Sequence, residues 1–260
     1  MEYGICPQAL VPVRVQPGDN QEMTNQLLFG DLVFINGRVK EWLLIKTVDD
    51  EYEGWVDQKQ VMVISKEEFN VLLNADRYYS LELSSNIYPE TSHGNLMFTL
   101  GARLPNFEKG RFTLGGRNYL FPGKTGCDKE KSTSEEILST AMKYLGSPYL
   151  WGGRSPFGID CSGLVQMVFK INGIFLPRDA SQQVSEGKAV NFIEEAQPGD
   201  LAFFGEEDAK ISHVGIIVDT GTLIHASGDV RINKVDHQGI YNHNLKKYTH
   251  KLRVIKRLLY

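Results

Sequence analysis

The sequence predicts an α+β protein in which short strands come first and a part with helices and a sheet follows. Before residue 124, short segments of alternating apolar and polar residues are separated by turn residues such as Pro17-Gly18-Asp19-Asn20. From residue 132 onwards, a helix-capping signature and helical apolar spacing precede several β-branched runs. A chain of 260 residues exceeds the ~100–200 residues of a typical domain, so we expect more than one domain.

Residues 1–63 are expected to form a small closed β-barrel, because several short strands follow one another within this segment. The dipeptide Asn36-Gly37 indicates a tight hairpin turn. The strands are expected at 11–15, 31–35, 42–46 and 54–56.

Residues 64–123 predict a second, degenerate β-barrel that opens with a short helix at 66–74. Gly115-Gly116 supplies a tight turn within it. Residues 124–131 are polar and charged and are interpreted as a linker. The strands of the second barrel are expected at 85–88, 96–100, 111–114 and 118–121.

Residues 132–260 are expected to form the α+β domain. Thr133 and Glu136 have the spacing of a capping box, which predicts a helix that continues through Tyr144. Two further helices are predicted at 161–171 and 179–186. The antiparallel strands are expected at 200–204, 213–218, 222–226 and 252–257.

The motif Asp160-Cys161-Ser162-Gly163-Leu164 places a cysteine at the first turn of a predicted apolar helix. The positive end of the helix dipole and the unpaired N–H groups there can lower a thiol pKa from about 8.5 to ~3.5–7.5. The pattern therefore predicts that Cys161 is a nucleophile. Because Cys161 shares one helical stripe with Leu164 and Val168, an inert buried thiol is the alternative.

His213 and His225 lie on two predicted strands joined by Asp219-Thr220-Gly221. A three-residue loop ending in a left-handed glycine opposes His213 to Ser227 and puts both histidines on one face, diagonally about 7–8 Å apart. With Cys161 they would form a nucleophile, a base and an orienting group. A zinc site of the same three residues lacks a second short-spaced ligand pair, so neither a metal nor another cofactor is predicted. The remaining histidines are interpreted as surface residues: His93, His237, His243 and His250.

Composition argues against several classes of function. A net charge of −4 and a pI near 5.9 argue against broad binding to nucleic acid or to an anionic membrane. No apolar run approaches the ~18 residues that span a bilayer. Residues 1–7 show no signal peptide, so we expect a cytoplasmic location, with export after loss of a signal peptide as the alternative. Cys6 and Cys127 belong to no paired motif and are interpreted as incidental thiols.

Six blocks that occur in order within residues 132–260 resemble the NlpC family of cell-wall cysteine peptidases. Gly54-Trp55-Val56 likewise resembles the late strand of bacterial Src-homology-3-like domains. The resemblance implies a papain-like peptidase domain preceded by one or two small β-barrels. Together, the two parts resemble family members that cut murein stem peptides between γ-D-glutamate and the diamino acid. The six blocks are Tyr149-x-Trp151-Gly152-Gly153, Asp160-Cys161-Ser162-Gly163-Leu164, Pro177-Arg178-Asp179, Gln197-Pro198-Gly199-Asp200-Leu201, His213-Val214-Gly215-Ile216 and Ile224-His225-Ala226.

The resemblance also suggests substrate-binding residues. A carboxylate at Asp179 could bind the free ammonium of an N-terminal L-alanine, and it fits a helix N-cap equally well. Such a gate for the amine would favour released muropeptides. A murein-peptide binding module with an inactive peptidase half, and an acyl transferase on the same fold, stay open as alternatives. The predicted substrate-binding residues are Tyr149, Trp151, Asp160, Ser162, Asp179, Ser181, Glu22 and Tyr52.

Overall fold

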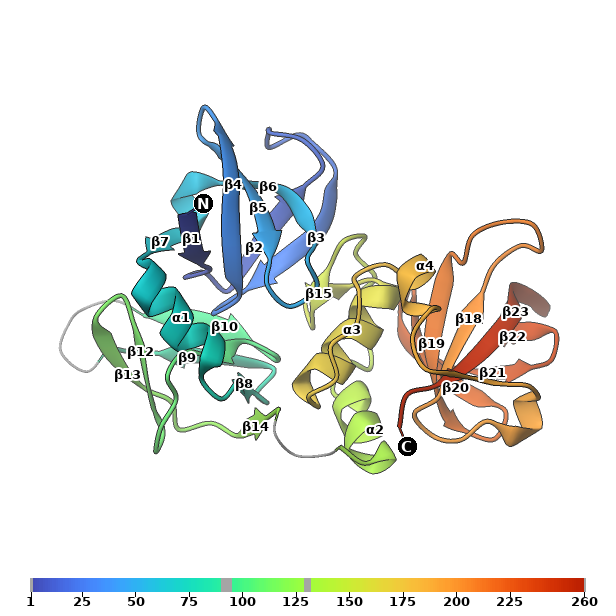
Figure 1. Ribbon diagram of the computed structural model, residues 1–260. Coiled ribbons are helices and arrows are strands. Elements are labelled where there is room, and N and C mark those ends of the chain that lie inside the picture. The colour runs from blue at the N-terminus through green and yellow to red at the C-terminus, as the bar shows by residue number, and fades with distance from the viewer. Residues whose placement is uncertain (1, 90–94, 129–131, 260) are drawn as a thin grey trace. The chain divides into compact units, whose positions relative to one another are not determined.

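The computed structural model describes residues 2–89, 95–128 and 132–259, and it confirms the predicted α+β class (Figure 1). The chain divides into two compact units. The N-terminal unit comprises residues 1–130 together with 151–156, and the C-terminal unit comprises residues 131–150 together with 157–260. Among the described residues, no helix has both the length and the apolar character needed to cross a membrane.

The first part of the N-terminal unit is a seven-stranded antiparallel sheet in the order β3-β2-β6-β5-β4-β1-β7. Its strands alternate buried and partly exposed residues, and they surround an aliphatic core that includes Val11, Val33, Ile45 and Val56. The strands are β1 Glu2–Ile5, β2 Leu10–Arg14, β3 Met23–Leu28, β4 Leu32–Val39, β5 Trp42–Thr47, β6 Glu53–Asp57 and β7 Met62–Ile64, with a 3₁₀ helix at Gln58–Gln60.

The hairpin turn predicted at Asn36-Gly37 is wrong. Both residues lie inside β4, where the pairing with β5 shifts register between Ile35 and Gly37. The strand continues to Val39, and Lys40 takes the positive φ of 51° that the turn requires. Asn36 and Gly37 therefore lie at a β-bulge within the strand, and the hairpin turn begins three residues after Gly37.

A second barrel was predicted at residues 64–123, and the described residues of this segment do not form one. Together with β14, which lies beyond the segment, they form three small separate sheets with the orders β10-β9, β11-β8-β14 and β12-β13. The turn at Gly115-Gly116 is confirmed, but β14 lies within the predicted linker. The elements are α1 Lys66–Asn74, β8 Tyr78–Ser80, β9 Ser84–Ile87, β10 Leu96–Thr99, β11 Arg103–Leu104, β12 Arg111–Leu114, β13 Arg117–Leu120 and β14 Thr125–Cys127.

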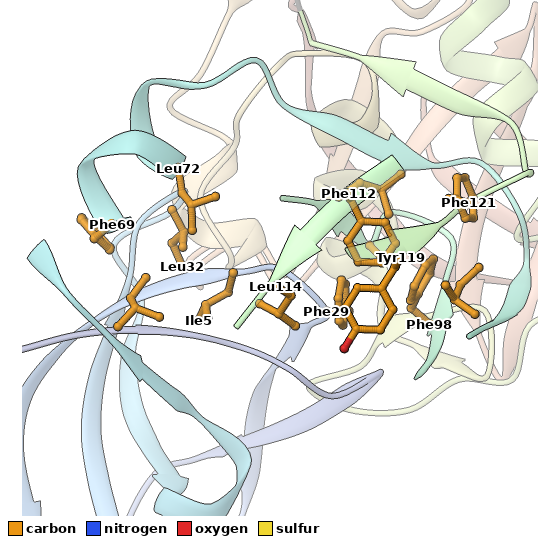
Figure 2. Close-up of a cluster of buried hydrophobic side chains, with 14 residues drawn as sticks. Ile5, Phe29, Leu32, Phe69, Leu72, Phe98, Phe112, Leu114, Tyr119 and Phe121 are labelled. Atoms are coloured by element: carbon orange, nitrogen blue, oxygen red, sulfur yellow. The ribbon is translucent and has the colours of Figure 1, made fainter. Parts of the chain in front are cut away.

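These small sheets share one core with the first part of the unit. Phe112 stacks on Tyr119 with ring centroids 5.0 Å apart, and Phe29 stacks on Phe98 at 4.9 Å (Figure 2). Phe29 comes from the segment between β3 and β4, so the two parts bury apolar surface against each other. Because the small sheets bury their apolar side chains in this shared core, they can be stable without closing into a separate barrel.

The C-terminal unit begins with helices. Thr133 and Glu136 form the predicted capping box of α2. Helix α3 packs against α2 on one side and against β19 and β20 on the other (Figure 1). The helices are α2 Ser134–Met142, α3 Cys161–Ile171 and α4 Ala180–Gln183, so the third is shorter than predicted.

The strands of the C-terminal unit close into a ring, because β23 pairs with β22 as well as with β18. Apolar side chains that include Phe204, Ile217, Leu223 and Ile240 fill this ring. The sequence did not predict β21 and β22. The strands are β17 Lys188–Val190, β18 Leu201–Phe204, β19 His213–Asp219, β20 Thr222–Ser227, β21 Asp229–Asp236, β22 Gly239–Asn242 and β23 Lys247–Arg257, with a 3₁₀ helix at Ile193–Glu195. Between α2 and α3 lie β15 Arg154–Ser155, in the N-terminal unit, and β16 Gly158–Ile159.

Candidate active site

Cys161 is the first residue of α3, as predicted, and is 7% exposed. Asp160 is the N-cap, and its Oδ1 accepts a hydrogen bond of 2.7 Å from the Gly163 N–H. The small side chains at 162 and 163 keep bulk away from the helix start. The cap therefore fixes the position of the thiol.

Arg178 neutralises the carboxylate beside the thiol. Its Nη1 donates to Asp160 Oδ1 at 3.0 Å and to Ser162 Oγ at 2.9 Å, and its Nη2 also bonds Asp160. Both partners of this ion pair are almost fully buried. Asp160 and Ser162 thus serve the start of α3, and their predicted contacts with a substrate stay predictions. Sequence analysis gave Arg178 only as part of a motif, because the spacing of the motif does not indicate which carboxylate Arg178 pairs with.

The thiol of Cys161 is protonated in the resting site. Burial and the neighbouring charge of Asp160 raise the pKa of Cys161 to about 11. Backbone hydrogen bonds from Val214 and Ser162 act in the opposite direction on this pKa. The expectation that the helix start would lower the thiol pKa is therefore wrong for the resting site, since desolvation outweighs the N–H groups. A thiolate has to be made by a neighbouring base.

The strand register brings His213 and His225 together. Ile217 opposes Leu223 and Ile216 opposes Ile224, which continued along the strands gives the predicted pairing of His213 with Ser227. A bulge between Ile217 and Asp219 compensates for a turn one residue shorter than predicted. His213 Nε2 and His225 Nδ1 are 2.8 Å apart. The predicted diagonal contact is thus present in the structure.

Asn233 on β21 completes a chain of hydrogen bonds that the sequence did not reveal. Its Oδ1 lies 3.0 Å from His225 Nε2, and an amide oxygen only accepts. His225 therefore carries its proton on Nε2, and its Nδ1 accepts a hydrogen bond from His213 Nε2–H. This leaves His213 Nδ1 unprotonated and able to take a proton. The only available signal was a polar residue in a strand that was itself missed.

The two histidines are neutral at physiological pH. Burial lowers the pKa of His213 well below its ordinary value, and His225 and His250 lower it further. Burial also lowers the pKa of His225 to about 4, although the bond to Asn233 acts in the opposite direction. Val214, whose backbone reaches the thiol, directly follows His213 in β19. The site thus combines a neutral thiol with a neutral base, and the proton moves as the sulfur attacks.

Tyr149 lies close to this site, whereas Trp151 belongs to the N-terminal unit. Burial, then the charges of Cys161 and Asp160, raise the pKa of Tyr149 to about 12, so its hydroxyl stays protonated. Trp151 Nε1 donates to Glu22 Oε1 at 2.8 Å within the N-terminal unit. The structure therefore brings two predicted residues together there.

The other predicted substrate-binding residues have simpler surroundings. Asp179 is exposed and is the N-cap residue of α4, where its backbone N–H donates to Gln182 Oε1. Ser181 is exposed in the same helix. Tyr52 lies in the N-terminal unit, and its backbone N–H donates to Thr47 Oγ1. Binding of substrate by these side chains stays a prediction.

One histidine assigned to the surface is part of the site. His250 is half-buried, and its ring stacks on that of His213 with centroids 4.2 Å apart. The polar neighbours of His250 in the sequence concealed this contact. His237 and His243 are exposed as predicted, and His93 lies outside the described residues.

Comparison with known proteins identifies both halves of the chain. Residues 146–253 match the NlpC/P60 family, and residues 13–61 match the bacterial dipeptidyl-peptidase SH3 domain. The predicted papain-like and Src-homology-3-like parts are thereby confirmed.

Two curated relatives extend over most of the chain. A γ-D-glutamyl-L-lysine dipeptidyl-peptidase of Bacillus subtilis is 31% identical over 212 residues, which are 77% of this chain and 71% of the relative. The protein of the same name from Bacillus cereus is 26% identical over 230 residues, 79% of this chain and 67% of the relative.

A solved structure of an NlpC/P60 family protein from Bacillus cereus has the same fold as the chain. Its TM-score is 0.85 at 21% identity, and the superposition covers 99% of each chain.

Proposed function

Because the chain belongs to the NlpC/P60 family of cysteine peptidases, we propose that it hydrolyses the γ-D-glutamyl–diamino acid bond of murein peptides with a free N-terminal L-alanine. The chemistry rests on one observation: the thiol at the start of α3 is hydrogen-bonded by the backbone of Val214, the residue that follows His213, and His213 in turn is hydrogen-bonded to His225. The substrate class is supported by the relatives, which are named γ-D-glutamyl-L-lysine dipeptidyl-peptidase and dipeptidyl-peptidase 6.

In the first half of the reaction, His213 Nδ1 takes the thiol proton while the Cys161 sulfur attacks the γ-carbonyl carbon. The negative charge moves to the carbonyl oxygen, where N–H groups of the α3 start can stabilise it by roughly 2.7–4 kcal/mol per donor. The imidazolium then gives its proton to the amine of the diamino acid, which leaves as the C–N bond breaks. A γ-glutamyl thioester remains on Cys161.

In the second half, water attacks the thioester and His213 Nδ1 takes the proton of that water. The C–S bond breaks and the thiolate recovers a proton from the imidazolium. His225 and Asn233 keep His213 in one tautomer throughout, since neither hydrogen bond has to break. The charged ring is not balanced by a carboxylate in this chain of hydrogen bonds, which is consistent with proton transfer only during attack.

The amine-recognition part of the proposal rests on Asp179. The residue before it, Arg178, bonds Asp160, and Gln183 from the same helix donates to the Ser162 carbonyl oxygen at 3.1 Å. Residues on both sides of Asp179 are thus tied to the α3 start, while its own side chain is exposed. A carboxylate there would attract an ammonium group of the substrate. We infer that released muropeptides in the cytoplasm are the substrates, rather than intact wall.

The test is hydrolysis of L-Ala-γ-D-Glu-diaminopimelate, the same peptide with L-lysine, and the N-acetylated form of each. We expect the dipeptide L-Ala-γ-D-Glu as a product, formed faster from the free amines. Asp179→Asn should lower this preference by up to about fivefold, because an exposed ion pair contributes up to ~1 kcal/mol. Asp208→Asn, at an exposed loop position, is the matched control.

Three outcomes would overturn parts of the proposal. Equal rates for the acetylated and free peptides would exclude recognition of the amine. Transfer of the glutamyl group to an added amine, in place of free acid, would identify an acyl transferase. Binding of the peptides without turnover would identify a binding module.

A further inference from the structure

His250 lies where β23 passes from one partner strand to another. It opposes Ile240 on β22, and two residues later Leu252 opposes Phe204 on β18. This crossover brings the His250 ring over His213, with centroids 4.2 Å apart and an angle of 28° between the planes. The contact is a stacked one, so it covers a face of the base.

The His250 ring is itself held in place. Its Nδ1 lies 2.9 Å from Thr249 Oγ1, and Phe204 meets the ring edge-on at 6.2 Å. His213 is thus held by its edge through the bond to His225 and by its face through His250. A ring stacked on the base is close enough to affect both its orientation and its charge.

We propose that His250 is a positioning residue for His213, whose stacked ring fixes the plane of the base and must be uncharged for His213 to accept the Cys161 proton. This inference rests on the proposed peptidase chemistry. In the reaction His213 becomes an imidazolium, and a neutral aromatic face tolerates that charge. A second imidazolium at 4.2 Å would oppose it.

Because His250 is the least buried of the three rings, we expect it to take the first proton when the cluster is acidified. Burial alone lowers the pKa of His250, which is the least buried of the three rings. Burial lowers the pKa of His213 well below its ordinary value, and that of His225 to about 4. Above the pKa of His250, its ring is neutral and His213 can accept the Cys161 proton, whereas below that pKa the charge of His250 suppresses activity. The titratable and charged groups around the cluster are His213 on β19, His225 on β20, and Asp229 and Arg231 on β21, which act on His225.

Three variants separate the face contact from the charge. His250→Phe keeps an aromatic face but cannot ionise, His250→Ala removes the face, and His237→Phe is a matched control at an exposed position. We expect His250→Phe to lower kcat at neutral pH by about threefold, through the lost Thr249 bond. The acidic limb of the pH profile of kcat should lie about one pH unit lower in His250→Phe than in the wild type. This is the low end of the pKa shifts that a neighbouring charge produces. His250→Ala should lower kcat by about tenfold with little change in KM, since a misplaced base slows only the chemical step.

A second readout does not depend on the peptide substrate. The rate at which iodoacetamide alkylates Cys161, followed by mass spectrometry of the peptide that contains it, reports proton transfer to His213. Its pH profile should shift in His250→Phe as kcat does. Wild-type protein that is alkylated with this profile but turns over no peptide would contradict the proposed function and leave the inference intact.

An acidic limb in His250→Phe identical to that of wild type, by both readouts, would overturn the role of the charge. Wild-type kcat in His250→Ala would overturn the role of the face. If His250→Phe does not fold, as judged by circular dichroism, His250→Asn takes its place, because it also lacks a group that ionises in this range. Its acidic limb should then shift in the same direction, and an unshifted limb would overturn the role of the charge.

Discussion

The N-terminal unit buries stacked phenyl and phenol rings, whereas the C-terminal unit buries stacked imidazole rings, which can bind a proton. Phe112 and Tyr119 stack with ring centroids 5.0 Å apart in the first unit (Figure 2). His213 and His250 stack with centroids 4.2 Å apart in the second unit. Burying a phenyl ring is favourable in proportion to its area. Burying an imidazole instead penalises its charged form, as the lowered pKa of His213 shows. The same geometry therefore stabilises one unit and prepares a base in the other.

The two units also differ in what surrounds a buried thiol. Burial raises the pKa of Cys6 in the N-terminal unit far above its ordinary value, and it raises that of Cys161 to about 11. The backbone of Val214, which follows His213, hydrogen-bonds the Cys161 thiol, whereas the groups that act on the Cys6 thiol are Gln8 and Asp31. A buried thiol becomes a nucleophile when a base is placed next to it, and otherwise it is inert.

The largest effect is expected from removing that nucleophile. Cys161→Ala should lower kcat/KM for the free-amine peptide by at least about 10⁴-fold, because no other group can form the thioester. Cys127→Ala, which removes a half-buried thiol of the N-terminal unit, should leave the rate unchanged. Steady-state kinetics with both variants checks this, and substantial turnover by Cys161→Ala would assign the reaction to another residue.

Truncating an aromatic ring should affect stability and spare the chemistry. Phe112→Ala removes a ring that stacks on Tyr119 and contacts Phe29, which should cost about 3–5 kcal/mol of unfolding free energy. Trp42, Trp55 and Trp151 all lie in the N-terminal unit, so urea unfolding followed by tryptophan fluorescence reports on this unit. Alkylation of Cys161 should keep its wild-type rate below the transition. A slower alkylation would show that the N-terminal core also shapes the thiol site.

Acid should weaken the C-terminal unit first. The pKa of His225 falls from an unfolded value near 6.5 to about 4, so between these values the unfolded state binds a proton that the folded state does not. Stability is thus lost as the pH falls from 6.5 to 4, by about 3 kcal/mol for His225 alone, and no more is lost below 4. Hydrogen exchange of β19 and β20, compared at pH 7 and pH 4 after correction for the intrinsic exchange rates, measures this loss. Equal acid sensitivity of the tryptophan-monitored unit would contradict the assignment to buried histidines.

The sequence was most informative where local chemistry decides the structure. The capping box at Thr133, the span of α3 and the placement of His213 and His225 on one face all follow from neighbouring residues. It failed where distant contacts decide. Asn36-Gly37 forms a bulge in β4 in place of the predicted turn. Residues 64–123, expected to form a barrel, share a hydrophobic core with the first sheet instead. His250 was misassigned because stacking on His213 depends on β23, which crosses from β22 to β18.

The end of the hydrogen-bond chain sets the tautomer of the base. Without the Asn233 oxygen, nothing holds the proton of His225 on Nε2, and the tautomer with the proton on Nδ1 becomes accessible. In that tautomer His225 donates to His213 Nε2, which places the His213 proton on Nδ1 and removes the base. Asn233→Ala should therefore lower kcat by about 10²-fold, less than the ~10⁴-fold that a fully wrong tautomer costs.

Two variants make the tautomer argument specific. Asn233→Asp keeps an acceptor and should retain most of kcat, while its charge raises the pKa of His225 and moves the acidic limb upward. Asn118→Ala in the N-terminal unit, where Asn118 bonds only Thr113 among the described contacts, should leave kcat unchanged. If Asn233→Ala and Asn118→Ala have the same kcat, the orientation of His213 does not depend on β21. The base would then be held by His225 and the stacked ring alone.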